Sequence, residues 1–149
     1  MQVSLVHIGS RLAPRDGFES LATDYMQRCS LFARCETASF RSEDALLDWL
    51  KKQKGRAPAI AVLCDARGCR MSSEAFAEWV GMRRDGGAQH LVFAVGPPDG
   101  WSEAARRRAD LLLSLGTMTL PHALARLMLA EQIYRAFTIL AGHPYHCGH

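Results

Sequence analysis

The sequence lacks several features that would place it in a specialised class of protein. No CxxC pair occurs among its five cysteines, so the spacing typical of a structural zinc site is missing. The opening residues, MQVSLVHIGS, contain no charged segment followed by a long apolar run, so we expect no signal peptide. Internal repeats, linkers and low-complexity segments are also absent. An odd number of cysteines without a secretion signal indicates reduced thiols in a cytoplasmic protein.

Long uncharged hydrophobic runs are missing too. The most apolar stretch, 124–141, carries Arg126, Glu131, Gln132 and Arg135, which makes it a poor membrane span. The formal charge of +3 is mildly basic, so it permits a nucleic-acid partner without requiring one. The run RRR at 106–108 is typical of a solvated helix face, although it could also contact the phosphates of a nucleic acid. With 149 residues, 48% of them apolar, we expect a single domain spanning 1–149.

Strand-like and helix-like segments alternate along the chain. Strands are predicted at 2–8, 35–40, 59–64, 90–95 and 111–115, judged by short apolar or alternating runs. Helices are predicted at 16–29, 43–53, 72–84, from 102 onward, and 121–141, judged by helical spacing and hydroxyl caps. The segment DARG at 65–68 reads as a turn after the third strand. This alternation favours an α/β domain with a largely parallel sheet.

The last predicted helix carries apolar side chains on more than one face. They are Leu124, Leu127, Met128, Leu129, Ile133, Tyr134, Phe137, Ile139 and Leu140. A single apolar stripe would be enough to pack a helix on a sheet. Either the helix is buried centrally within one chain, or its second face forms a dimer interface.

Three loops follow predicted strands at the edge where open α/β sheets bind ligands: LCDARG (63–68), VGPPDGW (95–101) and LSLGTMTLPH (113–122). The glycines of GPPDG do not match the dinucleotide pattern GxGxxG, so this segment reads as a turn. The third loop contains no charged residue and offers many main-chain donors and acceptors. It could hold an uncharged ring such as adenine, or it could be an ordinary connection.

The chain ends in GHPYHCGH, which allows several interpretations. His143 and His146 could be zinc ligands, but no third ligand is suggested nearby. Terminal residues are commonly disordered. Pro144 and Tyr145 favour order, because proline stiffens the chain and a tyrosine usually packs. The composition alone does not choose among a metal site, a loose end and a reactive group.

Residues 90–146 together resemble a known family. The order and spacing of VGPPDGW, ADLLLSLGTMTLPH, AEQIYRA and GHPYH are similar to those of the SPOUT-class ribosomal RNA large-subunit methyltransferase H family. The resemblance extends to LCDARG and to the opening strand that ends at Gly9. That family methylates N3 of a pseudouridine in 23S rRNA and uses S-adenosylmethionine as methyl donor. The resemblance therefore implies this reaction, 23S rRNA within the ribosome as partner, and no membrane association.

The resemblance also implies a fold and an assembly. We expect a SPOUT-type α/β domain with a parallel sheet, helices on both faces and a deep C-terminal trefoil knot, which is a rare feature that periodicity could not suggest. We further expect a homodimer formed through the knotted region. Threading and pairing together would cover the several apolar faces of the last helix.

Site residues follow from the same motifs. The residues that the resemblance implies for cofactor binding are Cys64, Gly96, Leu115, Gly116, Thr117, Met118, Thr119 and Leu120. The catalytic residues that it implies are Tyr145 and His146, from the family's terminal YH, and Arg135, from YRA. His146 is the candidate base, because an ordinary histidine pKa of about 6.5 leaves it mostly neutral. Arg135 is a candidate for holding a phosphate or a substrate oxygen. No metal is implied.

Three positions depart from the family pattern. Pro97 replaces a usual glycine and removes one N–H, and Cys64 replaces a usual leucine. The basic residue that follows YH is absent, because the chain ends in Cys147, Gly148 and His149, so His149 or another basic side chain would have to substitute. A non-catalytic ribosome- or RNA-binding module on the same fold is therefore the alternative hypothesis, and a metal-binding protein that uses the tail is a third.

Overall fold

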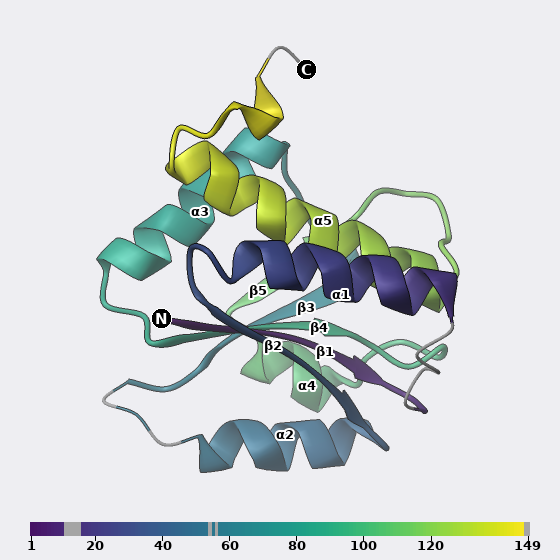
Figure 1. The fold of residues 1–149 in the computed structure, drawn as a ribbon. Coiled ribbons are helices and arrows are strands. Elements are labelled where there is room, and N and C mark those ends of the chain that lie inside the picture. The colour runs from purple at the N-terminus through teal and green to yellow at the C-terminus, as the bar shows by residue number, and fades with distance from the viewer. Residues whose placement is uncertain (11–15, 54, 56, 148–149) are drawn as a thin grey trace.

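The computed structural model describes residues 1–10, 16–53, 55 and 57–147. The strands are β1 (Gln2–Ile8), β2 (Arg34–Phe40), β3 (Ile60–Arg70), β4 (His90–Val95) and β5 (Leu111–Ser114). They form one sheet in the order β2-β1-β4-β3-β5, and the neighbouring strands run parallel (Figure 1). The helices are α1 (Gly17–Cys29), α2 (Glu43–Lys52), α3 (Ser73–Asp85), α4 (Glu103–Arg108) and α5 (His122–Leu140), followed by the 3₁₀ turn η1 (Pro144–His146). The predicted α/β fold with a parallel sheet is confirmed.

Helices cover both faces of the sheet, as expected. Helices α1, α3 and α5 lie on one face, and α2 and α4 lie on the other (Figure 1). The central strand β4 shows why both faces need cover. Its Leu91 and Phe93 belong to the core beneath α1, α3 and α5, whereas Val92 and Ala94 belong to the core beneath α2 and α4. Successive side chains of a strand point to opposite faces, so a strand buried on both reads as a continuous apolar run.

Polar side chains define where most helices begin. Asp16 accepts hydrogen bonds from the first turn of α1, and Ser42, Ser72 and Ser102 do the same for α2, α3 and α4. These bonds satisfy backbone N–H groups that have no partner within the helix. At the start of α5, Pro121 occupies the capping position, one residue before the first turn in which it was expected.

The predicted turn at 65–68 is wrong, because β3 continues through it to Arg70. Leu113 of β5 lies opposite both Cys64 and Cys69, so the residues between them form an irregular bulge. A side chain at Gly68 could not fit, since its Cβ would lie 2.6 Å from the carbonyl carbon of Leu112. The strand was predicted to end early because Asp65, Arg67 and Gly68 interrupt the apolar run.

Helix α5 is largely buried within the chain. It packs on α1 and α3 as well as on the sheet, and Leu129, Ile133 and Phe137 are among its buried side chains. Leu124, Leu127 and Met128 instead form a partly open apolar surface beside Leu21 and Tyr25 of α1. Central burial therefore explains one set of apolar positions and leaves a second set facing outward. Across the described residues, no helix is long and apolar enough to cross a membrane.

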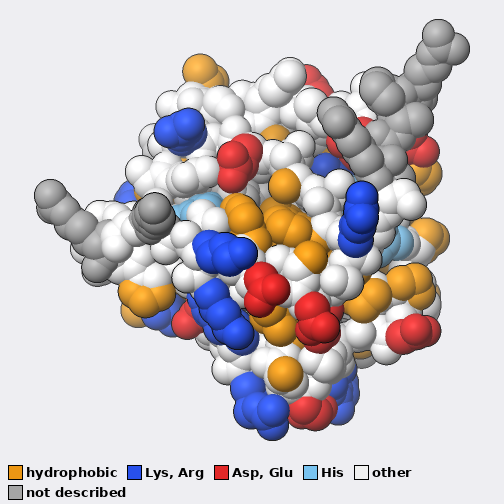
Figure 2. Space-filling view, turned by 90° about the horizontal axis from the view of Figure 1, so that it is seen from below, with side chains coloured by type: hydrophobic (Ala, Val, Ile, Leu, Met, Phe, Trp, Pro, Cys, Tyr) orange, Lys and Arg blue, Asp and Glu red, His pale blue; other side chains and the backbone are white. Residues whose placement is uncertain are grey.

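The face covered by α2 and α4 carries mixed charge. Figure 2 shows Lys and Arg side chains beside Asp and Glu on this side, with hydrophobic side chains between them. Two of the three arginines of RRR are paired with acids there: Arg106 contacts Asp65 and Glu103, and Arg108 contacts Asp110. The pairing agrees with a solvated face held by ion pairs, and it does not form a one-signed surface.

Candidate active site

The sheet order brings the expected cofactor residues to one edge. Strands β4, β3 and β5 are neighbours, so Gly96 after β4, Cys64 in β3 and the loop 115–120 after β5 come from adjacent strands. Ligands of open α/β sheets bind at the carboxyl ends of their strands. The bulge in β3 modifies this arrangement, since Cys64 lies within the strand and not at its end.

Trp101 joins two of these positions. Its indole Nε1–H donates a 2.8 Å hydrogen bond to the carbonyl oxygen of Cys64. A Cβ added to Gly96 would lie 2.6 Å from Cε2 of the same indole, so only glycine allows the ring to pack so closely. Trp101 is buried, and its contacts fix the spacing between the ends of β4 and β3. The sequence motif included this tryptophan without showing what it binds.

An ion-pair network holds the bulge beside α4. Arg106 Nε donates to Asp65 Oδ2 at 2.7 Å, and the backbone N–H of Arg67 donates to Asp65 Oδ1 at 2.8 Å. Burial acts to raise the pKa of Asp65, but these bonds and the positive charges of Arg106 and Arg67 outweigh it, so the net shift is downward. Next to it, burial raises the pKa of the Cys64 thiol to about 12. Cys64 therefore stays protonated and is not a nucleophile.

The loop 115–120 presents uncharged main chain. Gly116 has a φ of +134°, a backbone conformation that favours glycine, and its N–H donates to the hydroxyl of Ser114. Thr117, Met118 and Thr119 are exposed, with Met118 84% accessible. Within the described part of the chain, residues 117–120 make no backbone hydrogen bonds of their own. These amides and carbonyls remain available to a ligand.

The tail folds back onto α5. Gly142, with a φ of +68°, ends the helix, and the N–H of His143 donates to the carbonyl of Thr138. The residues Pro144–His146 then form η1. Tyr145 packs edge-on against Tyr134, with ring centroids 4.8 Å apart. As far as residue 147 the tail is ordered; Gly148 and His149, which were considered as a substitute cation, lie outside the described residues.

The three expected catalytic residues are linked to Glu131, two of them directly and His146 through Arg135. Glu131 Oε1 accepts hydrogen bonds from Tyr145 Oη at 2.9 Å and from Arg135 Nη2 at 2.6 Å. The guanidinium of Arg135 also lies over the ring of Tyr145, 4.9 Å from its centroid. Arg135 Nη1 lies 2.9 Å from His146 Nδ1. One carboxylate therefore organises the arginine and the tyrosine, and the arginine in turn orients the histidine.

The partners of His146 identify its tautomer. A guanidinium can only donate, so His146 Nδ1 must accept the bond from Arg135. The other nitrogen, Nε2, lies 2.8 Å from Glu74 Oε1, and a carboxylate accepts the proton that Nε2 carries. His146 is thus neutral and engaged at both nitrogens. Before it can accept another proton, Nδ1 has to leave Arg135.

Electrostatics separate the roles of the tail residues. Burial is the main cause that raises the pKa of Tyr145, and hydrogen bonds with Tyr25 and Glu131 raise it further. The phenol therefore stays protonated and acts as a donor. The hydrogen bond to Glu131 raises the pKa of Arg135, which remains a cation. The hydrogen bond from His146 lowers the pKa of Glu74, which keeps this carboxylate ionised. His146 is the one member of the three that can act as a base.

The tail and the cofactor loop do not meet within one chain. Loop 115–120 precedes α5 and the tail follows it, and this helix has 19 residues. At 1.5 Å per residue the helix is about 28 Å long. In Figure 1 the carboxyl ends of β1 and β2 lie toward one end of α5, and η1 lies past the other end. The expected site residues therefore form two separate groups, which we call half-sites: the loop with Cys64 and Gly96, and the tail with Arg135.

The sequence motifs did not include Glu131 and Glu74, which hold the tail residues in place. Glu131 lies four residues before Arg135, which is the spacing of a helical ion pair and could have predicted that contact. Nothing local linked Glu74 to His146, because they are 72 positions apart. The metal interpretation of the tail made His143 a zinc ligand, but its Nδ1 already accepts a hydrogen bond from the backbone N–H of Tyr145. No group of three metal-binding side chains is found among the described residues.

Comparisons with known proteins agree with this architecture. Residues 1–146 match the family model described as predicted SPOUT methyltransferase. Two solved structures of the SpoU methyltransferase AviRb from Streptomyces viridochromogenes have a similar fold, with TM-scores of 0.51 for the complex with AdoMet and 0.54 for the protein alone. The matches cover 96% and 95% of this chain but only 58% and 61% of AviRb, at 15% and 13% identity. At that identity the likeness supports the fold alone.

Relatives of known name are closer in sequence. Ribosomal RNA large subunit methyltransferase H of Koribacter versatilis is 44% identical over 149 residues, which is all of both chains. The protein of the same name from Brucella anthropi is 56% identical over 88 residues, covering 59% of this chain and 55% of that relative. Together with the family model, this full-length similarity shows that the chain belongs to the SPOUT methyltransferases, in the ribosomal RNA large-subunit methyltransferase H family.

Proposed function

We propose that the protein transfers a methyl group from S-adenosylmethionine to N3 of a pseudouridine in the 23S rRNA of the large ribosomal subunit. The observation that carries this proposal is the tail: Arg135 and Tyr145, which match the family's motifs, are held on one carboxylate, Glu131, and Arg135 in turn contacts the third motif residue, His146. The full-length similarity to a large-subunit rRNA methyltransferase supports the substrate.

The loop half-site has the chemistry that S-adenosylmethionine requires. The main chain of 117–120 is free to bind an adenine edge, and the loop carries no charged side chain to repel a sulfonium. Gly96 and Cys64 would line the same side, with Trp101 keeping them apart at a fixed distance. When bound, the cofactor supplies an electrophilic methyl group. The protein residues then have to position the acceptor nitrogen and remove its proton.

The tail residues divide that work. His146 takes the N3 proton once Nδ1 is released from Arg135, and its Nε2–H stays with Glu74. Arg135, a permanent cation, stabilises the anion that develops on the base or holds a substrate oxygen. Tyr145, kept protonated, donates a hydrogen bond and anchors η1 on α5. Arg135 is also the basic side chain in direct contact with His146, in a tail that lacks the usual basic residue after YH.

A homodimer would unite the two half-sites. The loop and the tail lie near opposite ends of α5, so a second copy has to supply the missing half. The partly open apolar surface formed by Leu21, Tyr25, Leu124, Leu127 and Met128, with a concavity of about 300 Å³, provides a surface for pairing. We propose that two copies pack through this surface, so that each tail reaches the loop of the other.

Three further properties belong to the same proposal. We propose that the segment from β5 through α5 forms a deep trefoil knot, as in the family that the sequence resembles. The whole chain, 1–149, would then act as one domain in the cytoplasm, where ribosomes are its substrate. The burial of α5 against α1, α3 and the sheet is what threading would require.

The test combines binding with transfer. Calorimetry should detect S-adenosylmethionine binding, and ribosomes that lack the modification should acquire one methyl group per large subunit. The variant His146→Ala should lose transfer and keep cofactor binding, and deletion of 147–149 tests the unusual end separately. A wild-type protein that binds RNA but shows no affinity for the cofactor would instead favour the non-catalytic RNA-binding module, and cofactor binding without transfer would reject the proposed reaction.

A further inference from the structure

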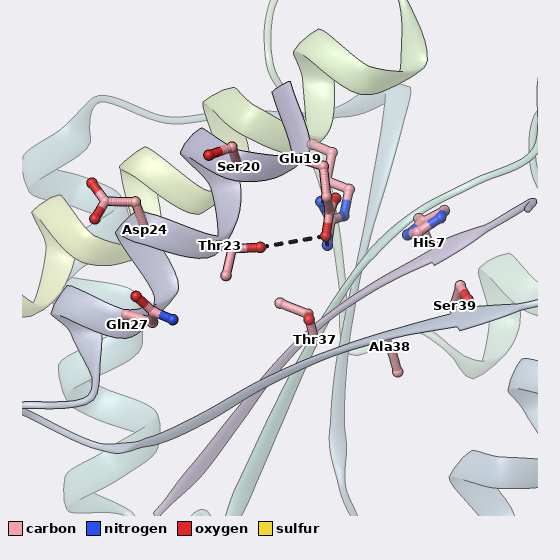
Figure 3. A pocket seen from close by; sticks show the side chains of 10 residues that line it. His7, Glu19, Ser20, Thr23, Asp24, Gln27, Thr37, Ala38 and Ser39 are labelled. Atoms are coloured by element: carbon pink, nitrogen blue, oxygen red, sulfur yellow. Dashed lines mark hydrogen bonds and ion pairs between the residues drawn. The ribbon is translucent and has the colours of Figure 1, made fainter. Parts of the chain in front are cut away.

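A polar pocket of about 740 Å³ lies between α1 and the strands β1 and β2. Neither half-site described above includes it. Figure 3 shows Glu19, Thr23 and Gln27 of α1 pointing toward the strand that carries Thr37, with His7 at one end of the space. Its volume is within the range of small-molecule sites. Its lining is unusual for such a site, because hydroxyls, carboxylates and an amide predominate.

The wall of this pocket contains buried polar atoms that have no partner. Among the described residues, three buried side-chain nitrogen or oxygen atoms make no hydrogen bond: His7 Nδ1, His122 Nε2 and Arg126 Nε. All three belong to one cluster. The rings of His7 and His122 meet edge-on, 5.6 Å apart, and His7 and Arg126 both line the pocket at 4% and 2% exposure. Buried polar groups are nearly always paired, so the two such atoms on lining residues, His7 Nδ1 and Arg126 Nε, have hydrogen-bonding capacity that the described chain does not use.

The hydrogen-bonding capacity of these atoms can be assigned. His7 Nε2 lies 3.0 Å from the carbonyl oxygen of Ser10, which can only accept, so Nε2 carries the proton and Nδ1 is an acceptor. Burial lowers the pKa of His7, which keeps the ring neutral. Arg126 Nε–H is a donor. The cluster therefore offers one donor and one acceptor that the described chain does not use, and a hydroxyl group can pair with either.

Charge argues against a phosphate in this pocket. The guanidinium of Arg126 is already paired with the carboxylate of Glu19 through Nη1 and Nη2. The other acid in the lining, Asp24, is paired with Arg28 at 2.9 Å. Among the described residues that line the pocket or pair with its lining, two carboxylates balance two guanidinium groups, and no uncompensated positive charge is found there. Carboxylates and hydroxyls together suit a neutral polyol such as a sugar, whose hydroxyls both donate and accept.

The pocket adjoins the cofactor half-site. His122 is the first residue of α5 and comes two residues after Leu120, the end of the expected cofactor loop. Arg126 is one helical turn further along the same helix. A ligand that contacts this cluster would therefore lie beside the cofactor loop, on the side of β1 and β2. For an enzyme that acts on RNA, a neighbouring nucleotide of the substrate would occupy that position.

We propose that this pocket binds the ribose of an rRNA nucleotide that flanks the methylated base, and that it recognises the sugar through its hydroxyl groups. The inference rests on the proposed function, because it takes the substrate to be RNA. Contacts to the 2′-hydroxyl are how a protein distinguishes RNA from DNA at a given position. The pocket would thereby contribute substrate selection without touching the reacting nitrogen.

The test is an NMR titration that observes the His7 and His122 imidazole signals, with S-adenosylmethionine present to fill its own site. The probes are the tetranucleotide r(UUUU), its deoxy counterpart d(UUUU), and inorganic phosphate. We expect r(UUUU) to shift both histidine signals and d(UUUU) to need about a fivefold higher concentration, the value of one hydrogen bond. Equal response to both oligonucleotides, no response to either, or a response to phosphate would each overturn the proposal.

Variants localise the effect to the pocket. Thr37→Val keeps the side-chain volume and removes a hydroxyl from the lining, so it should reduce the preference for r(UUUU); Thr37→Ser keeps the hydroxyl and should retain it. A preference that Thr37→Val leaves unchanged would contradict the assignment. Because the titration requires no methyl transfer and can be repeated without cofactor, a failed transfer assay rejects the proposed reaction while the ribose preference is still measured.

Discussion

Glu131 holds the tail on α5, so Glu131→Gln is expected to release it. Glutamine has nearly the same shape as glutamate but carries no charge. In the wild-type protein Oε1 of Glu131 accepts bonds from Tyr145 and from Arg135, whose guanidinium in turn reaches His146. The substitution weakens the direct anchor of Tyr145 and loosens the arginine that orients His146. Both effects act on η1 and leave the loop half-site untouched.

The magnitude follows from the change in hydrogen-bond strength. A bond to a charged group contributes about 1.5–3 kcal/mol, and a neutral one about 0.5–1.5 kcal/mol, so the bond from Tyr145 loses about 1 kcal/mol. The bond from Arg135 lies within α5 and is made whether the tail is docked or released, so it is not counted. The docked state of the tail should therefore lose about 1 kcal/mol, which is roughly a 5-fold change in the ratio of docked to released tail. The Glu131 side chain is 19% exposed, so solvent screening reduces this value only modestly.

Amide hydrogen exchange, measured by NMR, reports the ratio of docked to released tail. The N–H groups of Tyr145 and Cys147 make hydrogen bonds only while η1 is formed. Their exchange should be about 5-fold faster in Glu131→Gln. The matched control is Glu78→Gln, an exposed glutamate on α3 without an ion-pair partner in the described structure. If the two variants exchange at the same rate as the wild type, Glu131 does not hold the tail and the reasoning is refuted.

Three other perturbations test the remaining parts of the structure. Gly96→Ala forces its new Cβ against the Trp101 indole, so it should lower the free energy of unfolding by about 1–3 kcal/mol in thermal unfolding and weaken cofactor binding. The control is Gly17→Ala, whose Cβ meets nothing within 4 Å. Equal melting temperatures for the two variants would contradict the packing. Asp65 has a lower pKa folded than unfolded, so its ion pair stabilises the fold above pH ~4 and the contribution disappears as the pH falls through the folded pKa. In urea unfolding between pH 6 and pH 3.5, Asp65→Asn should therefore show a flatter acid limb, whereas Asp48→Asn on exposed α2 should keep the wild-type slope; a wild-type slope in Asp65→Asn would disprove the linkage. Met128→Glu places a charge on the proposed pairing surface, so light scattering should detect monomers. Met82→Glu, at an exposed position of α3, is the control and should leave the assembly unchanged. If Met128→Glu still forms dimers, this surface is not the dimer interface.

Much of the fold followed from local pattern. The five strands and five helices were predicted because each has its own periodicity and most helices begin at a serine or aspartate. The length of β3 was not predicted, because the bulge at 65–68 exposes Ala66 and Arg67 and is held by α4, which lies some forty residues away. Periodicity reports burial on a face, and a bulged strand with exposed side chains gives no such signal.

The site was predicted in parts. Arg135, Tyr145 and His146 were named from motifs, and the structure brings them together; their catalytic roles stay predictions. What the motifs could not provide is the geometry between distant segments: Glu74 beside His146, Trp101 beside Gly96, and the separation of loop and tail along α5. These depend on how helices pack on the sheet, which a linear pattern does not encode.

The most direct test of the central claim is methyl transfer to large ribosomal subunits prepared from cells that lack the modification. With S-adenosylmethionine labelled in its methyl group, the purified protein should place one label per subunit, and mass spectrometry of the digested 23S rRNA should locate it at N3 of a pseudouridine. Transfer to another position would revise the substrate. A protein that binds the cofactor but labels no rRNA, or that binds none, would contradict the proposed reaction.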